Sequence, residues 1–356
     1  MRKVDRPPRV LSKLLVDITQ GTPLSTNSIL NGLGRAWFAG RIACAVGLLD
    51  SAAAASVAAP VIADMVGTVT QKAFASASLK HELAYLLYLP PGYAPATATR
   101  YPVLYLLHGR GNKMAAWTNS KTDLDRLIST GRIPPVIAIM PDAPASRRAG
   151  YYIDSQFTGS ADPKLPPGEP VETAITQDLI AHVDATYPTR TDRNGRIVAG
   201  YSMGGYGALR YSLAHPELFG AAIVLSPAVY FPLPPPDSST REFGAFGQGA
   251  KVFDDEVYTA LNYPATIPAF VAKGLPLIMF IAVGDDEAAL ADPAEASHDL
   301  DYEAHTLYNR IRRVPHITSE LRVVNGPHDW ATWRPTFIEG VEYVFAKVQP
   351  AATSGR

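Results

Sequence analysis

The sequence has little cysteine, little net charge and no long apolar run. Its single cysteine, Cys44, excludes an intramolecular disulfide framework and any zinc or iron–sulfur site built from several cysteines. The 32 Lys+Arg and 33 Asp+Glu leave a formal net charge of −1, without the basic excess that nucleic acid or an anionic membrane attracts. No uninterrupted apolar stretch reaches the ~18–20 residues of a membrane span. We therefore expect no nucleic-acid partner, no stable membrane insertion and no metal site.

The composition is that of a globular protein. The 356 residues are 47% hydrophobic and 18% charged, which is typical of a folded chain with a sizeable core. Residues 1–65 differ from the rest. They combine a basic leader, an apolar run from Ile42 to Leu49 that ends at Asp50, and an alanine-rich run from Ser51 to Ala59. These parts are typical of a secretory signal, so we expect an N-terminal extension and a secreted protein. A cytoplasmic protein with a loosely ordered extension is the alternative.

Apolar runs of strand length alternate with amphipathic stretches of helical spacing beyond residue 80. The predicted strands are 82–90, 101–109, 135–141, 196–201, 221–225, 276–284 and 319–325, and the predicted helices are 123–130, 171–187, 205–215, 299–313 and 335–348. This alternation predicts one α/β domain, residues 66–350, with a mostly parallel central sheet and helices on both faces. A tail, 351–356, follows. The first two strands are joined by a short Pro/Gly turn and are expected to pair as an antiparallel hairpin at the sheet edge.

One long segment interrupts the alternation. Residues 230–275 begin with a proline-rich stretch, Pro232 to Pro236, and show no clear period. A long connection of this kind in a compact domain is typical of a lid over a functional site. Its aromatic residues, Tyr230, Phe231, Phe243 and Phe246, are therefore expected to line a pocket for the acyl group of a substrate.

The strongest chemical signal is Gly200-Tyr201-Ser202-Met203-Gly204. It follows the predicted strand 196–201 and opens the predicted helix 205–215, which is the context of a nucleophile elbow. Glycines two residues before and after Ser202 remove Cβ atoms that would collide across such a turn. The helix N-terminus supplies N–H groups to a developing oxyanion. Ser202 is therefore the candidate nucleophile.

A base and an acid are expected after the strands that follow Ser202. Of the eight histidines, His328 lies just after the last predicted strand, where the base of a serine hydrolase stands. The strand 276–284 ends in three adjacent carboxylates, Asp285, Asp286 and Glu287, and one of them is expected to orient the histidine. The residues alone leave the choice among the three open.

The loop Leu107-His108-Gly109-Arg110-Gly111 follows the predicted strand 101–109. Its backbone N–H at Arg110, together with that of Met203, is the candidate oxyanion hole, and His108 is expected to orient the loop. Aromatic residues follow these motifs, and a pocket lined by such side chains is expected beside the nucleophile. The candidate substrate-binding residues are Trp117, Tyr201 and Trp330.

Four motifs together resemble an esterase family of the α/β-hydrolases. They are residues 87–93 (LYLPPGY), 101–109 (YPVLYLLHG), 200–209 (GYSMGGYGAL) and 326–333 (GPHDWATW). The family includes feruloyl and acetylxylan esterases, enterochelin esterases, S-formylglutathione hydrolases and the antigen 85 mycolyltransferases. The resemblance implies an α/β-hydrolase fold, Ser202 as nucleophile, His328 as base, and oxyanion N–H groups at Met203 and Arg110. It places the acid at Glu287, where aspartate is commoner in the family, and Asp286 is the alternative.

These features predict a serine carboxyl-ester hydrolase that works through an acyl-enzyme on acyl, acetyl or feruloyl esters, free or linked to a polysaccharide. No cofactor is required for this chemistry. The alternatives are an acyltransferase of the mycolyltransferase type and a non-catalytic relative that binds carbohydrate or lipid. A binding protein has no need of an intact serine, histidine and acid, which disfavours the last alternative.

Overall fold

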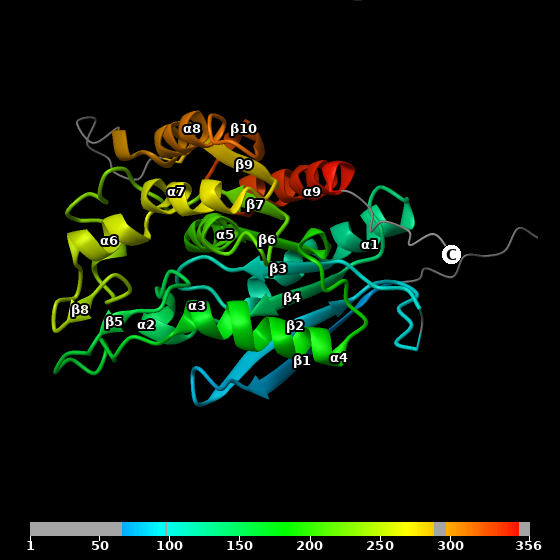
Figure 1. Cartoon of the computed structure of the whole chain (residues 1–356), viewed down its shortest axis with the longest axis horizontal. Helices are drawn as coiled ribbons and strands as arrows, with labels where there is room; N and C mark the ends of the chain where they lie inside the picture. The colour runs from blue at the N-terminus through cyan, green and yellow to red at the C-terminus, as the bar shows by residue number, and fades with distance from the viewer. Residues whose placement is uncertain (1–65, 97, 288–296, 349–356) are drawn as a thin grey trace, which may run out of the picture. The chain divides into compact units, whose positions relative to one another are not determined.

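The computed structural model describes residues 66–348 apart from residue 97 and residues 288–296 (Figure 1). The predicted N-terminal extension with its signal region, and the tail 351–356, lie outside the described residues, so extension and export stay predictions. None of the described helices combines the length and apolar character of a membrane span.

The core of the described part is an eight-stranded sheet in the order β1-β2-β4-β3-β6-β7-β9-β10. The strands are β1 (Thr68–Ala75), β2 (Glu82–Leu89), β3 (Val103–Leu107), β4 (Ile137–Pro141), β6 (Arg196–Tyr201), β7 (Ala221–Leu225), β9 (Leu277–Asp286) and β10 (Ile317–Pro327). From β4 to β10 every neighbouring pair is parallel, while β2 runs antiparallel to both β1 and β4. The prediction of a mostly parallel sheet is confirmed.

The predicted hairpin between the first two strands is wrong. Strand β2 pairs with β4, and β4 separates it from β3. All five residues of β3 are buried, so this strand needs a partner on each side and pairs in parallel with β4 and β6. The true partner of β2 at the edge is β1, a strand that the sequence analysis missed. Six of the eight residues of β1 are exposed, so it lacks the apolar run by which the other strands are recognised.

Helices cover both faces of the sheet, as predicted (Figure 1). One face packs against α3 (Val171–Thr173), a π-helical turn (Ala174–Leu179), α4 (Ile180–Thr186), α5 (Met203–Ala214), α6 (Asp255–Leu261), α7 (Tyr263–Lys273) and α8 (Leu300–Ile311). The other face packs against α1 (Lys121–Ser129) and α9 (Trp330–Lys347). A short helix α2 (Ala145–Arg148) and a two-stranded sheet of β5 (Gln156–Phe157) and β8 (Gln248–Gly249) lie outside these layers.

The long connection 230–275 contains more regular structure than its sequence indicates. Residues 248–273 contain β8, α6 and α7, whereas residues 230–247 contain only one short 3₁₀ turn, Ser239–Arg241. The two helices were missed because they bury few side chains, chiefly Tyr258 in α6 and Tyr263 and Phe270 in α7. Pro268 inside α7 further disguises its helical pattern.

Candidate active site

The predicted functional residues meet at one edge of the sheet because they follow neighbouring parallel strands. Strands β3, β6, β7, β9 and β10 are adjacent, and their carboxyl ends point the same way. The residues directly after them are His108 after β3, Ser202 after β6, Ser226 after β7, Glu287 after β9 and His328 after β10. In an open parallel sheet this edge is where ligands bind.

The strand-to-helix turn at Ser202 has the predicted strained form. Ser202 has φ 56° and ψ −122°, and it caps the N-terminus of α5. A Cβ on Gly200 would lie 2.0 Å from the Gly204 carbonyl oxygen, and a Cβ on Gly204 would lie 2.1 Å from the Leu107 carbonyl oxygen. Neither position tolerates a side chain. The prediction that the two glycines permit the turn is confirmed.

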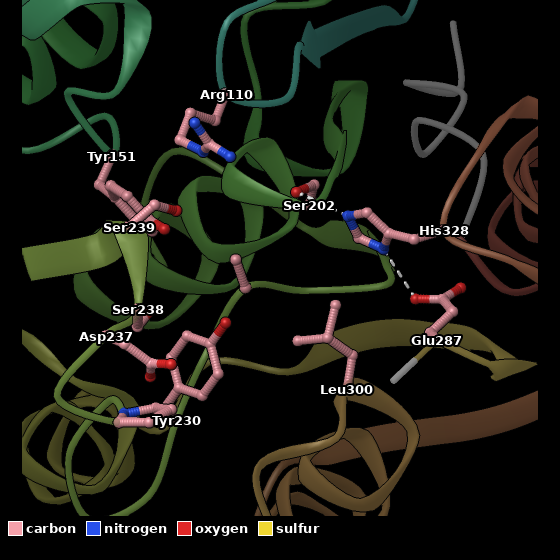
Figure 2. Close-up of a pocket in the computed structure, with 12 residues that line it drawn as sticks. Arg110, Tyr151, Ser202, Tyr230, Asp237, Ser238, Ser239, Glu287, Leu300 and His328 are labelled. Atoms are coloured by element: carbon pink, nitrogen blue, oxygen red, sulfur yellow. Dashed lines mark hydrogen bonds and ion pairs between the residues drawn. The ribbon is translucent and has the colours of Figure 1, made fainter. Parts of the chain in front are cut away.

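A continuous chain of hydrogen bonds links Ser202, His328 and Glu287 (Figure 2). The Nε2 atom of His328 lies 3.0 Å from Ser202 Oγ, and its Nδ1 atom lies 2.9 Å from Glu287 Oε2. Because a carboxylate only accepts, the neutral imidazole carries its proton on Nδ1 and leaves Nε2 free to accept the serine hydroxyl. This arrangement prepares Nε2 to receive the Ser202 proton.

Glu287 is the carboxylate that reaches the imidazole, and it is only 2% exposed. Its Oε1 accepts hydrogen bonds of 2.7 Å from both the Gly284 N–H and the Ser226 hydroxyl. The other two candidates, Asp285 and Asp286, are exposed, and Asp285 Oδ1 accepts from the Gly326 N–H instead. Both ring nitrogens of His328 are already occupied, so the geometry favours Glu287 over its neighbours.

Ser226 is a site residue that the sequence analysis missed. The Trp333 Nε1–H donates to Ser226 Oγ at 3.0 Å, and Ser226 in turn donates to Glu287. The Trp333 ring also stands edge-on to the His328 ring, with centroids 5.0 Å apart. Trp333 therefore holds the imidazole directly and the carboxylate through Ser226. The position of Ser226 directly after a buried strand was the one available signal.

The loop after β3 packs tightly against the turn at Ser202. A Cβ on Gly109 would lie 3.3 Å from the Ser202 Cβ, so the Arg110 backbone follows a residue in contact with the nucleophile candidate. His108 is fully buried; its Nδ1–H donates to the Gly109 carbonyl at 2.9 Å, and its Nε2 accepts from the Ala143 N–H at 3.2 Å. Burial lowers the pKa of His108, in keeping with this neutral form. The geometry agrees with the prediction that His108 orients the loop.

A cleft of about 370 Å³ opens beside Ser202 and His328 (Figure 2). Its opposite wall comes mainly from the start of the long connection, and this wall is largely polar. The residues lining the cleft are Arg110, Tyr151, Ser202, Ala228, Tyr230, Pro235, Asp237, Ser238, Ser239, Glu287, Leu300 and His328. The long connection thus borders the site, as a lid-like segment should.

The cleft is lined by the aromatic residues Tyr151 and Tyr230, and the three candidate substrate-binding residues Trp117, Tyr201 and Trp330 lie elsewhere. Trp117 and Tyr201 are fully buried and pack beneath the turn at Ser202 within the core that α1 and α9 cover. Trp330 is half-buried on the same cluster, with its ring centroid 5.5 Å from that of Trp117 and 5.1 Å from that of Tyr201. None of the three lines the cleft. The three rings contact one another beside the start of α9, so packing in the core accounts for them.

The aromatic residues of the lid-like segment also differ from expectation. Tyr230 lines the cleft, but Phe231 and Phe243 do not, and Phe246 is fully buried against Tyr151 and Tyr258. The Tyr230 backbone is fixed from behind, because its N–H donates to the Tyr258 hydroxyl at 2.9 Å. The wall therefore presents one aromatic ring among hydroxyl and charged groups.

Within the described ranges, His, Cys, Asp and Glu side chains form no group of three or more that could hold a metal ion. In the cleft, His328 and Glu287 are engaged with each other, and Glu287 also accepts from the Gly284 N–H.

Comparison with known proteins places the chain in a family. Residues 76–344 match the family described as "Putative esterase", which covers most of the chain. The chain belongs to this esterase family. The predicted resemblance is confirmed, and membership supports the prediction of a carboxylic ester hydrolase.

Individual relatives agree with the family. A xylanase/feruloyl esterase of Xylanibacter ruminicola is 32% identical over 191 residues, which are 52% of this chain and 25% of the relative. An iron(III) enterobactin esterase of Escherichia coli is 29% identical over 250 residues, covering 69% of this chain and 50% of the relative. The chain thus spans a quarter to a half of the length of these relatives. The solved structure of a ferulic acid esterase superimposes with a TM-score of 0.62 at 23% identity, over 79% of this chain and 99% of that one. The predicted α/β-hydrolase fold is confirmed.

Proposed function

We propose that this esterase-family chain hydrolyses carboxylic esters through an acyl-enzyme, with Ser202 as the nucleophile. The observation that carries the proposal is the hydrogen-bonded chain from Ser202 through His328 to the buried Glu287 at the base of the cleft. In the first step Ser202 Oγ attacks the ester carbonyl while His328 Nε2 takes the hydroxyl proton. Glu287 orients the imidazole and stabilises its cationic form.

The second half of the reaction uses the same residues. The imidazolium gives its proton to the leaving alcohol, and His328 then activates a water that attacks the acyl-enzyme and releases the acid. The N–H groups of Met203 and Arg110 are the proposed donors to the oxyanion, since one opens α5 and the other follows the glycine that packs on Ser202. This chemistry needs no cofactor.

We infer that the substrates are acyl, acetyl or feruloyl esters, including esters of polysaccharides. A relative named as a feruloyl esterase supports this class. The cleft supports it too, because Tyr230, Ser238 and Ser239 provide a polar wall opposite Ser202, which suits an alcohol rich in hydroxyl groups.

The proposal is tested first by covalent labelling. A fluorophosphonate probe should label the wild-type protein and leave Ser202→Ala unlabelled, because the probe reacts with an activated serine. Equal labelling of the two proteins would contradict Ser202 as the nucleophile. Absence of labelling in a folded wild-type protein would favour a non-catalytic binding relative.

A substrate panel then defines the reaction. Hydrolysis rates are measured for p-nitrophenyl esters of graded chain length, feruloyl esters and acetylated xylan. Each reaction is repeated with a sugar acceptor. Formation of a new sugar ester in place of free acid would identify an acyltransferase of the mycolyltransferase type.

A further inference from the structure

Arg110 is a charged side chain in the cleft that forms no ion pair with any residue in the described part of the chain. It is exposed and lines the cleft together with Ser202 and His328. In the view of Figure 2 its guanidinium lies between Ser202 and the pair formed by Tyr151 and Ser239. An unpaired guanidinium beside a proposed nucleophile has five donors available to a ligand.

The structure does not use the Arg110 guanidinium to hold its own loop. That task falls to Arg148, whose Nη1 and Nη2 donate to the two carboxylate oxygens of Asp142 at 2.6 and 3.0 Å. Arg148 Nη1 also donates to the Asn112 carbonyl at 3.2 Å, and the Gly111 N–H donates to the Arg148 carbonyl at 3.0 Å. The loop is therefore anchored independently of the Arg110 side chain.

The carboxylates of the cleft do not neutralise Arg110 either. Glu287 is buried and its two oxygens are taken by Gly284, Ser226 and His328. Asp237 also lines the cleft, and it is not among the ion-pair partners of the arginines in the described part of the chain. The cleft consequently has a positive end beside Ser202 and a negative group elsewhere on its wall.

The Arg110 charge also acts on the interior of the cleft. Burial raises the pKa of the Tyr151 and Tyr230 hydroxyls, and the Arg110 guanidinium opposes this rise at both. Both tyrosines line the cleft, so the positive charge of Arg110 interacts with groups on its other walls.

We propose that Arg110 recognises a carboxylate on the ester substrate, an inference that rests on the proposed function. A guanidinium binds a carboxylate through two parallel, charge-assisted hydrogen bonds, and partial exclusion of water in the cleft strengthens them. Asp237 restricts the position of the anion, since a carboxylate on its side of the cleft would be repelled. The carboxylate belongs either to the acyl group or to the alcohol, and the experiment separates the two.

The experiment uses two pairs of esters in which a carboxylate is exchanged for a carboxamide of the same shape. Monoethyl adipate and ethyl 5-carbamoylpentanoate carry the difference on the acyl side; 4-acetoxybenzoate and 4-acetoxybenzamide carry it on the alcohol side. The readout is the ratio of kcat/KM for the carboxylate ester to kcat/KM for its carboxamide partner. Arg110→Gln keeps the backbone N–H. Any damage that the variant does to the loop lowers kcat/KM for both esters of a pair and leaves their ratio unchanged.

We expect Arg110→Gln to lower this ratio about tenfold or more in one of the two pairs, and Arg110→Lys to lower it less. Asp237→Asn should raise it, because the variant removes a repelling charge. The matched control is Arg147→Gln. Arg147 is an exposed arginine that stacks over Phe243 and is absent from the cleft lining, so its loss should leave the ratio unchanged.

An unchanged ratio in both pairs, in an Arg110→Gln protein that the fluorophosphonate probe still labels, would overturn this inference and leave the proposed function standing. An equal fall in Arg147→Gln would also overturn it, because net charge alone would then explain the effect. A folded wild-type protein that is neither labelled nor active on any ester would overturn both proposals.

Discussion

Two buried glutamates support opposite sides of the cleft, and they are held differently. Glu287, on the side of Ser202 and His328, receives hydrogen bonds on both oxygens from three donors. Glu303 of α8 supports the opposite wall and is only 1% exposed. Among the described residues, only its Oε1 is seen to accept, from the Phe231 N–H at 2.9 Å and from His298 Nδ1 at 3.2 Å.

We call the side of the cleft that Glu287 supports the fixed side, and the wall that Glu303 supports the adjustable side. Both carboxylate oxygens of Glu287 accept hydrogen bonds, and these fix the chain of hydrogen bonds to Ser202 in one geometry. Burial raises the pKa of Glu303 to about 7, because fewer compensating donors face its carboxylate. The wall residue Tyr230 precedes Phe231, so the position of the wall is connected to a group that changes charge near neutral pH.

The largest expected effect on kcat comes from substitutions of Ser202 and His328 on the fixed side. Ser202→Ala or His328→Ala should lower kcat by ~10³-fold or more, since the proposed nucleophile and base act as one unit. Steady-state kinetics with a p-nitrophenyl ester, with circular dichroism as the check of folding, measures this. Retention of a tenth of wild-type activity by either folded variant would contradict the assignment.

The next effect concerns the acid. Glu287→Gln should lower kcat by roughly 10²-fold or more, because an amide neither fixes the imidazole tautomer nor stabilises its cation. Asp285→Asn and Asp286→Asn are the matched controls, since both residues are exposed neighbours in the same strand end. The measurement is kcat for the three variants side by side. A larger loss in Asp286→Asn would assign the acid to that residue.

The adjustable side should respond to pH through Glu303. The folded-state pKa of about 7 exceeds the ordinary value of 4.5, so the folded protein binds more protons than the unfolded chain between these two values. The stabilising effect of the protonated carboxyl is fully present below pH 4.5 and is lost as the pH rises through 7, by about 3 kcal/mol. Glu303→Gln stays neutral and should lack this loss.

Urea unfolding between pH 5 and pH 8 measures the effect, with the exposed Glu256→Gln as the control. Parallel pH profiles for wild type and Glu303→Gln would show that Glu303 does not titrate in this window. If the pH dependence of the free energy of unfolding changes in Glu303→Gln and not in Glu256→Gln, the titrating group is Glu303 on the adjustable side.

The smallest expected effect is on the shape of the wall. Tyr230→Ala should enlarge the cleft and raise kcat/KM for long acyl chains relative to acetate by about tenfold, because each added methylene gains apolar contact. Chain-length profiles with p-nitrophenyl esters test this, and a profile that superimposes on that of wild type would remove Tyr230 from the acyl site. Replacement of residues 233–248 by a short loop would test the role of the wall in acyl-chain preference less cleanly, because it also removes the buried Phe246 from the core.

Sequence alone located the candidate residues whose placement depends on local chain geometry. Ser202 was found from the two glycines that its strained turn requires, and the central strands were found from apolar runs that only a buried sheet explains. His328 followed from chain order, since the ends of parallel strands meet at one edge. These features are contained in a few consecutive residues, and the family resemblance added the preference for Glu287.

Only the tertiary structure decided which side chains meet across the site. Three adjacent carboxylates are equivalent in the sequence, and the turn after β9 alone buries Glu287 beneath His328 while its neighbours remain exposed. Ser226 has its place because β7 lies between β6 and β9 in the sheet. Trp117 belongs to the core and Arg110 to the cleft, although both follow the same strand. Such choices depend on contacts between segments far apart in the chain, and no local pattern encodes those contacts.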